Sequence, residues 1–222
     1  MSLSLQFLGQ SGFLLKGEQT TLVIDPFLAG NPKAPFPLSE LKDVDWVLAT
    51  HDHDDHWPDV IPLAKATGAG VVAQVELALV AAEAGVERVE PMNIGGFVIV
   101  GDAKVHCVHA QHTSKLGDPT GFVVEMEGHT IYHAGDTGLF GDIALIGTLY
   151  APDIALVPCG NRFTMGADHA AEAVRMVGAS IAIPMHYGTF DLLEDNADAF
   201  VEAVGDAATV HTPAPGEWVA FL

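Results

Sequence analysis

Short apolar runs and alternating hydrophobic and polar positions recur along the chain, separated by turns that contain glycine or proline. Runs of about four to eight residues of this kind are typical of β-strands. The pattern predicts strands over residues 3–8, 12–16, 21–26, 44–50, 71–74, 97–100, 104–109, 121–127, 129–134, 153–158, 181–185, 209–211 and 218–222.

Helical signals lie between these strands. One helix is indicated by Trp57-Pro58-Asp59 at its start and Gly68 after its end, and another by an Ala/Leu-rich run that stops at Gly85. The helices predicted in this way cover residues 58–66, 75–84, 168–177 and 196–204.

The order of the predicted elements repeats along the chain. Each half begins with a hairpin-rich run and continues as alternating strands and helices. This order predicts an α/β fold in which two mixed β-sheets pack face to face with helices outside, a four-layer αββα sandwich. We find no linker or low-complexity segment, so we expect a single domain over residues 1–222.

The composition favours a globular chain. Of 222 residues, 49% are hydrophobic and 17% charged, and no apolar run approaches the roughly 18 to 20 residues that a membrane-spanning helix needs. The N-terminus alternates like a strand and lacks the basic start of a signal peptide. Cys107 and Cys159 are too few for a disulfide framework and are typical of a reducing compartment. We therefore expect a cytoplasmic protein without a membrane partner.

The net charge limits the choice of partners. It is −20, from 29 acidic against 9 basic residues, and no cluster of Lys and Arg offsets it. Because such a surface repels phosphate backbones, we expect no nucleic-acid partner. The apolar content leaves room for a subunit interface, so a homo-oligomer is compatible with the sequence.

The densest polar stretch is Thr50-His51-Asp52-His53-Asp54-Asp55-His56, directly after the apolar run Trp46-Val47-Leu48-Ala49. It begins where a predicted strand ends, which is where α/β folds usually build their sites. Neutral imidazole and ionised carboxylate are ligands of zinc and similar divalent ions. The alternative is a solvated loop, but an ordinary loop rarely concentrates three histidines with Asp55.

Three more strand ends carry the same chemistry. His112 follows the strand predicted over residues 104–109, Asp136 follows a strand in Gly135-Asp136-Thr137, and His186 follows the run that ends at Met185. A strand end holds a ligand rigidly. One such histidine alone is most simply a surface or core residue, but four strand ends of the same kind favour a shared metal site.

These motifs together resemble a known family. The stretch from His51 to His56, followed in order by His112, Gly135-Asp136-Thr137 and His186, resembles the metallo-β-lactamase superfamily. Residues 7–13, 163–166 and 184–190 resemble its branch of small metal-dependent hydrolases related to ascorbate-6-phosphate lactonase. That branch commonly has His where this chain has Gln10.

The resemblance implies two divalent metal ions, with zinc as the first candidate and manganese or iron as alternatives. The ligands it implies are His51, His53 and His112 for one ion, Asp55, His56 and His186 for the other, and Asp136 as the bridge between both. A hydroxide between the ions would attack carbon or phosphorus. Asp55 would also be the catalytic residue that orients the water or carries its proton.

The resemblance therefore implies a metal-dependent hydrolase of a small molecule with a lactone, ester or phosphodiester bond. We expect this molecule to be anionic because two basic residues lie beside the site motifs. Lys115 and Arg162 fall beside the site motifs, and either could orient a carboxylate or phosphate instead of being a solvated charge. The alternative is a non-catalytic or redox metal-binding protein of the same fold. A redox diiron protein typically has Glu at the position of His53, which argues for hydrolysis.

Other polar residues are candidates for contacts with the ligands. Asp25 ends a predicted strand, and His133 could donate a hydrogen bond to a ligand carboxylate. His106 and His109 lie on one strand, where support of a ligand competes with core filling. His169 could line the site or lie on the surface.

Overall fold

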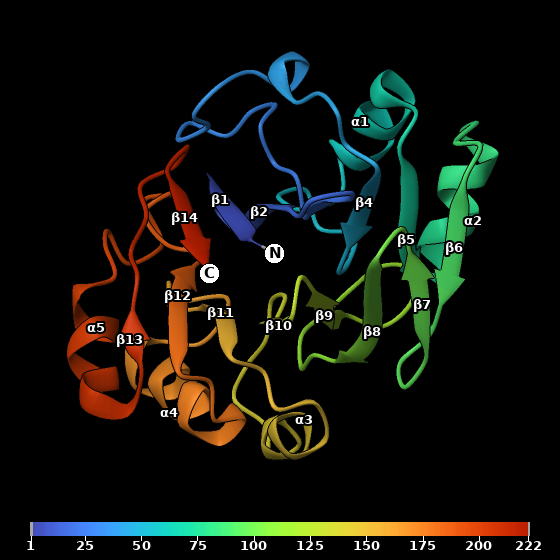
Figure 1. The fold of residues 1–222 in the computed structure, drawn as a ribbon. Helices are drawn as coiled ribbons and strands as arrows, with labels where there is room; N and C mark the ends of the chain where they lie inside the picture. The colour runs from blue at the N-terminus through green and yellow to red at the C-terminus, as the bar shows by residue number, and fades with distance from the viewer. Residues whose placement is uncertain (1, 222) are drawn as a thin grey trace.

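The computed structural model describes residues 2–221, and within them two seven-stranded β-sheets face each other (Figure 1). The first sheet has the strand order β14 (Trp218–Phe221), β1 (Leu3–Gly9), β2 (Gly12–Lys16), β3 (Thr21–Ile24), β4 (Trp46–Ala49), β5 (Gly70–Gln74) and β6 (Val89–Met92). Strands β14 to β3 pair antiparallel, whereas β3 to β6 pair parallel.

The second sheet repeats this arrangement. Its order is β13 (Thr209–Val210), β12 (Ile181–Met185), β11 (Ile154–Pro158), β10 (His129–His133), β9 (Thr120–Met126), β8 (Ala103–His109) and β7 (Phe97–Val100). Strands β7 to β10 pair antiparallel and β10 to β13 pair parallel. Each sheet thus combines a hairpin-rich half with a parallel half, as the order of sequence signals predicted.

Helices cover the outer faces of both sheets. α1 (Val60–Thr67) and α2 (Val75–Glu83) pack on the first sheet, and α4 (Ala167–Val177) packs on the second between α3 (Ile143–Tyr150) and α5 (Asp198–Val204) (Figure 1). Short 3-10 helices occupy Leu38–Glu40 and Gly205–Ala207. The predicted four-layer αββα sandwich is confirmed.

Burial of both faces of β4 explains why its sequence is apolar throughout. Successive side chains of a strand point to opposite faces of the sheet. Val47 packs in the cluster beneath α1 and α2, whereas Leu48 packs in the larger cluster, which fills the space between the sheets. Both faces of β4 are therefore buried, and the strand ends where the polar loop from Thr50 begins.

Two elements were not expected from the sequence. β6 contains Pro91 and lies at the edge of its sheet, where the missing N–H is tolerated. α3 contains Gly147, which weakens a helical signal. A Cβ at Gly147 would lie 2.5 Å from the Val177 carbonyl oxygen, so glycine allows α3 to approach α4.

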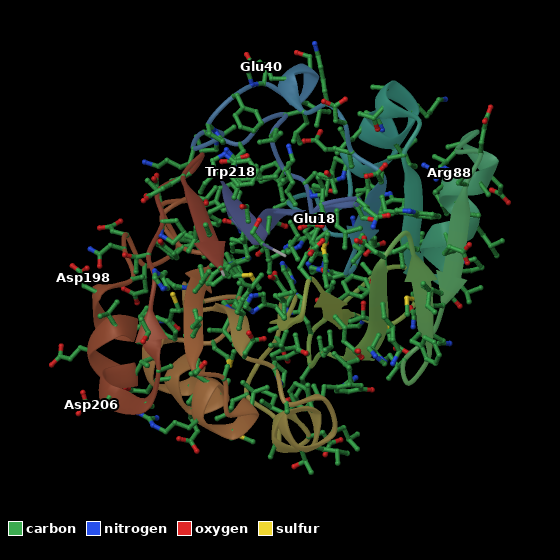
Figure 2. All side chains as sticks on the ribbon, in the orientation of Figure 1. Glu18, Glu40, Arg88, Asp198, Asp206 and Trp218 are labelled. Carbon is green, nitrogen blue, oxygen red and sulfur yellow. The ribbon has the colours of Figure 1, made fainter. Side chains whose placement is uncertain are left out.

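The strand predicted over residues 218–222 is β14 up to Phe221, and Leu222 lies outside the described residues. The single domain over residues 1–222 stays a prediction. In the part of the chain that the structure describes, no helix is long and apolar enough to cross a membrane. Figure 2 shows Glu40, Asp198 and Asp206 pointing away from the body of the molecule, as expected for a chain with net charge −20.

Candidate metal centre

Four loops meet at one end of the sandwich, and each follows the C-terminal end of a strand. The loop after β4 carries His51, His53, Asp55 and His56, the loop after β8 carries His112, the loop after β10 carries Asp136, and the loop after β12 carries His186. The structure therefore brings together all seven side chains that the sequence singled out. They form two groups that share Asp136, and within each group the potential ligand atoms lie within 4.8 Å of one another.

The first group consists of three imidazoles and one oxygen of Asp136. His51 Nε2 lies 3.1 Å from His53 Nδ1 and 3.9 Å from Asp136 Oδ2. His112 Nε2 lies 3.6 Å from the same oxygen. His51 is buried, while His53 and His112 are partly exposed, so this group is open to solvent on one side.

The second group consists of two imidazoles, Asp55 and Asp136. His56 Nε2 lies 3.3 Å from Asp136 Oδ1 and 3.6 Å from Asp55 Oδ2. His186 Nε2 lies 3.1 Å from Asp136 Oδ2 and 3.4 Å from Asp55 Oδ2. Asp136 is thus central to both groups.

These distances fit a metal site. Two ligand atoms on one tetrahedral zinc ion, each about 2.0 to 2.1 Å from it, lie about 3.3 Å apart. His56 Nε2 is buried without a hydrogen-bond partner among the described residues, although it faces two carboxylates. A metal cation would give a buried nitrogen of this kind a partner. The cluster is therefore able to hold a metal ion.

Glycine shapes the loop that carries Asp136. Gly135 has φ 61°, a left-handed conformation that other residues rarely adopt. A Cβ at this position would collide with the Thr120 carbonyl oxygen. The turn that brings Asp136 into the site therefore requires glycine.

Asp25 fixes the orientation of two imidazoles, that of His56 directly and that of His51 through Thr50. It is buried, has φ 46°, and accepts hydrogen bonds from His56 Nδ1 at 2.7 Å and from Thr50 Oγ1 at 2.6 Å. Because the Thr50 hydroxyl donates to Asp25, it can only accept from His51 Nδ1, 2.9 Å away. Both imidazoles thereby keep their proton on Nδ1 and turn Nε2 toward the cluster. Asp25 was a sequence candidate for such a contact, whereas Thr50 was missed.

Gln10 supports the opposite side of the cluster. Its Nε2 donates to Asp55 Oδ2 at 2.7 Å, and its carbonyl oxygen accepts from His186 N at 2.7 Å. Gln10 and His186 have φ 55° and 58°, so both residues have a strained backbone, and the hydrogen bond between them helps to maintain it. The sequence singled out Gln10 only because the resembling branch commonly has His there.

The charges of the cluster depend on one another. Burial would raise the pKa of Asp136, but the neighbouring His186 and His56 outweigh it and lower this pKa well below its usual range. Burial also opposes the charged imidazoles, yet Asp136 raises the pKa of His56 well above 6.5 and that of His186 to about 9. For His51, burial and the adjacent His56 lower the pKa to about 3. The carboxylates thus make the second group a place for positive charge.

Asp52 is not part of the cluster but joins two of its loops. It accepts hydrogen bonds from Ser114 Oγ and from Lys115 N, both at 2.9 Å. These bonds fix the loop with His112 to the loop after β4. The ammonium group of Lys115 makes no ion pair within residues 2–221, and Lys115 does not line the cavity above the cluster.

Three other histidines do not contact the cluster. His133 Nε2 donates to the Ser11 carbonyl oxygen at 2.9 Å and not to a ligand carboxylate. His106 lies on β8 2.7 Å from Glu125, and His169 is exposed on α4. Each has a structural partner or a surface position instead.

A cavity of about 870 Å³ opens above both groups. Its polar wall includes ligand candidates together with Asp54, Gln111 and Arg162, and its apolar wall is formed by Phe27, Phe163 and Phe190. A volume of this size accommodates a small organic molecule. The open side of the cluster therefore faces this cavity, whose remaining wall includes Arg162 and three phenylalanines.

The αββα sandwich with a His/Asp cluster at the strand ends defines a metallo-β-lactamase fold. The family model "Beta-lactamase superfamily domain" matches residues 20–187. A UPF0173 metal-dependent hydrolase of Methanopyrus kandleri is 44% identical over 95% of this chain and 96% of its own length. One from Staphylococcus aureus is 41% identical over 99% of this chain and 100% of its own. The structure of Igni18, a metallo hydrolase from Ignicoccus hospitalis, superposes with TM-score 0.93 at 32% identity, covering 100% of this chain and 99% of that one.

The chain therefore belongs to the metallo-β-lactamase superfamily and, within it, to the UPF0173 metal-dependent hydrolases. The predicted superfamily is confirmed. The relation to ascorbate-6-phosphate lactonase stays a prediction.

Proposed function

We propose that this hydrolase uses two divalent metal ions to cleave a lactone, ester or phosphodiester bond in a small, anionic molecule. The observation that carries the proposal is the position of Asp136. Its Oδ2 lies 3.6 Å from His112 Nε2 in the first group and 3.1 Å from His186 Nε2 in the second. A bridging ligand must face two sets of donors in this way.

The proposed ligands are His51, His53 and His112 for one ion, Asp55, His56 and His186 for the other, and Asp136 for both. Imidazole and carboxylate in this mixture suit zinc, and manganese or iron as alternatives. When bound, the ions supply a hydroxide near neutral pH and Lewis acidity toward the substrate.

Asp55 is the proposed catalytic residue. Its contacts with Gln10, His56 and His186 all use Oδ2, and Oδ1 has no partner among residues 2–221. Burial opposes the charged form, but the hydrogen bond with His186 and the charge of His56 lower the pKa of Asp55 below its usual range. The free oxygen of an ionised carboxylate that lines the cavity can accept a proton from the attacking water.

Two measurements test the proposal. Elemental analysis after reconstitution with zinc should find two ions per chain, and the loaded protein should hydrolyse members of a panel of lactones, esters and phosphodiesters. A chelator should remove both the ions and the activity. Absence of bound metal would refute the ligand assignment. Two bound ions with no turnover across the panel would favour the non-catalytic alternative.

A further inference from the structure

The cavity above the cluster has two walls of different chemistry. Phe163 and Phe190 are 51% and 39% exposed, and Phe190 packs against the buried Phe27 with ring centroids 6.2 Å apart. Large aromatic side chains left open beside a cavity are covered when an apolar ligand binds. This wall therefore fits a ring or a branched alkyl group.

Arg162 is the cation of the other wall. It lines the cavity and is exposed, and it makes no ion pair or hydrogen bond within the described residues, although the chain has 29 acidic residues. An unpaired guanidinium beside a site for divalent cations experiences repulsion unless an anion lies between them. Asp54, the carboxylate outside the cluster that shares the cavity, forms no such pair with Arg162.

The backbone holds Arg162 in this position at a cost. Asn161 and Arg162 have φ 61° and 58°, two consecutive left-handed residues that are not glycine. Hydrogen bonds fix the turn: Asn161 N donates to the Met165 carbonyl oxygen at 2.9 Å, and Asn161 Nδ2 donates to Glu194 Oε1 at 3.2 Å. Strain of this kind collects at functional sites. The turn places Arg162 and Phe163 side by side on the cavity wall.

We propose that the substrate is amphipathic: an oxyanion, carboxylate or phosphate, binds Arg162, and an apolar group of aryl size packs among Phe27, Phe163 and Phe190. This inference rests on the proposed function for the scissile bond and adds the two groups that determine selectivity. Arg162 supplies a planar fork of donors that matches an oxyanion. Lys115, the other cation beside the motifs, takes no part because it lies outside the cavity.

Calorimetric titration of the metal-loaded protein tests the proposal without requiring turnover. The probes are phenyl phosphate and phenylacetate, each paired with inorganic phosphate or acetate, and benzyl alcohol as the uncharged control. We expect each aryl anion to bind at least about tenfold more tightly than its small partner and than benzyl alcohol. Comparison of the two aryl anions decides between phosphate and carboxylate.

Variants separate the two walls. Arg162→Asn keeps a residue that tolerates the left-handed turn and should weaken both aryl anions about tenfold or more, whereas Arg162→Lys should recover part of the loss. Phe163→Ala should weaken the aryl anions and leave inorganic phosphate unchanged. The matched control Lys115→Asn should change nothing.

Equal affinity of Arg162→Asn and the unsubstituted protein for the aryl anions, with unchanged metal content and circular dichroism, would overturn the proposal. So would equal affinity for aryl and small anions. Failure of the proposed function has a different signature, namely no bound metal or no turnover. In that event the same titrations on the metal-free protein still decide the role of Arg162.

Discussion

The side-chain amide of Gln10 donates a hydrogen bond to Asp55 Oδ2 over 2.7 Å, while its main-chain carbonyl oxygen accepts one from His186 N. One residue on the turn after β1 thus positions two of the proposed ligands of the same ion. Gln10 is itself buried, so its contacts with the cluster are protected from water.

Substitution Gln10→Ala should weaken binding of one ion more than the other. The variant keeps the main-chain bond to His186 but removes the bond that orients Asp55, and loss of such a partner typically costs about 10- to 100-fold in metal affinity. Competition with a chromophoric chelator measures both affinities. Gln6→Ala is the matched control. Gln6 Nε2 donates a 2.8 Å hydrogen bond to the carbonyl oxygen of Gly216, which lies outside the cluster. Equal metal affinities of the two variants would contradict the positioning role.

Asp25→Asn should leave the protein folded but impair its binding of metal. The amide oxygen can still accept from the Thr50 main-chain N–H. Its NH₂ group would replace Oδ2 and face both Thr50 Oγ1 and His56 Nδ1, which would drive the imidazole proton to Nε2, the proposed ligand atom. We expect a folded protein that loses at least one equivalent of zinc by elemental analysis.

The control for this substitution is Asp59→Asn. Asp59 is equally buried and accepts from the main-chain N–H groups of Leu28 and Ala29 at 2.6 and 2.8 Å, with no histidine among its partners. Both variants should lose stability, by about 1.5 to 3 kcal/mol for a weakened bond to a charged group. Full zinc content in Asp25→Asn would show that Asp25 does not set the tautomer of His56.

Gly147→Ala should destabilise the fold, although alanine is the better helix former. The added Cβ would lie 2.5 Å from the Val177 carbonyl oxygen, and overpacking of this kind costs about 1 to 3 kcal/mol. Chemical denaturation measures the difference. Gly141→Ala just before α3, where a Cβ would meet nothing within 4 Å, should change stability by less than about 0.5 kcal/mol. A stabilised Gly147→Ala protein would mean that α3 and α4 can separate without cost.

Gly147 also illustrates what the sequence could not reveal. The strands other than β6, and the strand-end positions of His112 and His186, could be predicted because they follow from local periodicity and from abrupt changes of polarity. α3 could not, because its glycine serves a tertiary contact with α4 that the local sequence does not reveal. The same limit applies to cations: Lys115 and Arg162 look equivalent beside their motifs, and only the fold puts Arg162 on the cavity wall.

The hydrogen-bond partners of Asp25 and Gln10 could not be predicted from the sequence either. Each bond joins residues far apart in the chain, and both residues take a left-handed backbone conformation. Asp25 could be suspected from its place at a strand end. Its contacts with Thr50 and His56 depend on the parallel pairing of β3 with β4, which brings the ends of the two strands together.

Both thiols should be inert in the native protein. Burial raises the pKa of Cys107 and of Cys159 to about 12, so only about one thiol in ten thousand is ionised at pH 8. A disulfide reagent such as DTNB should therefore react with the native chain no faster than it unfolds, and with two thiols at once in guanidinium. Rapid native labelling of either cysteine would contradict this. Because the unfolded thiols ionise from about pH 9.0, stability should fall as the pH rises above that value.

Asp136→Ala should remove both metal ions together and abolish hydrolysis. Its two oxygens lie within 3.9 Å of imidazole nitrogens from both groups, so the substitution removes the ligand that the two groups share. The control Asp54→Ala removes an exposed carboxylate of the same cavity that lies outside the cluster, and it should retain two zinc ions per chain. Elemental analysis and the hydrolysis panel give the two readouts. If Asp136→Ala kept one ion and measurable turnover, the bridge would be wrong and a single-metal mechanism would follow.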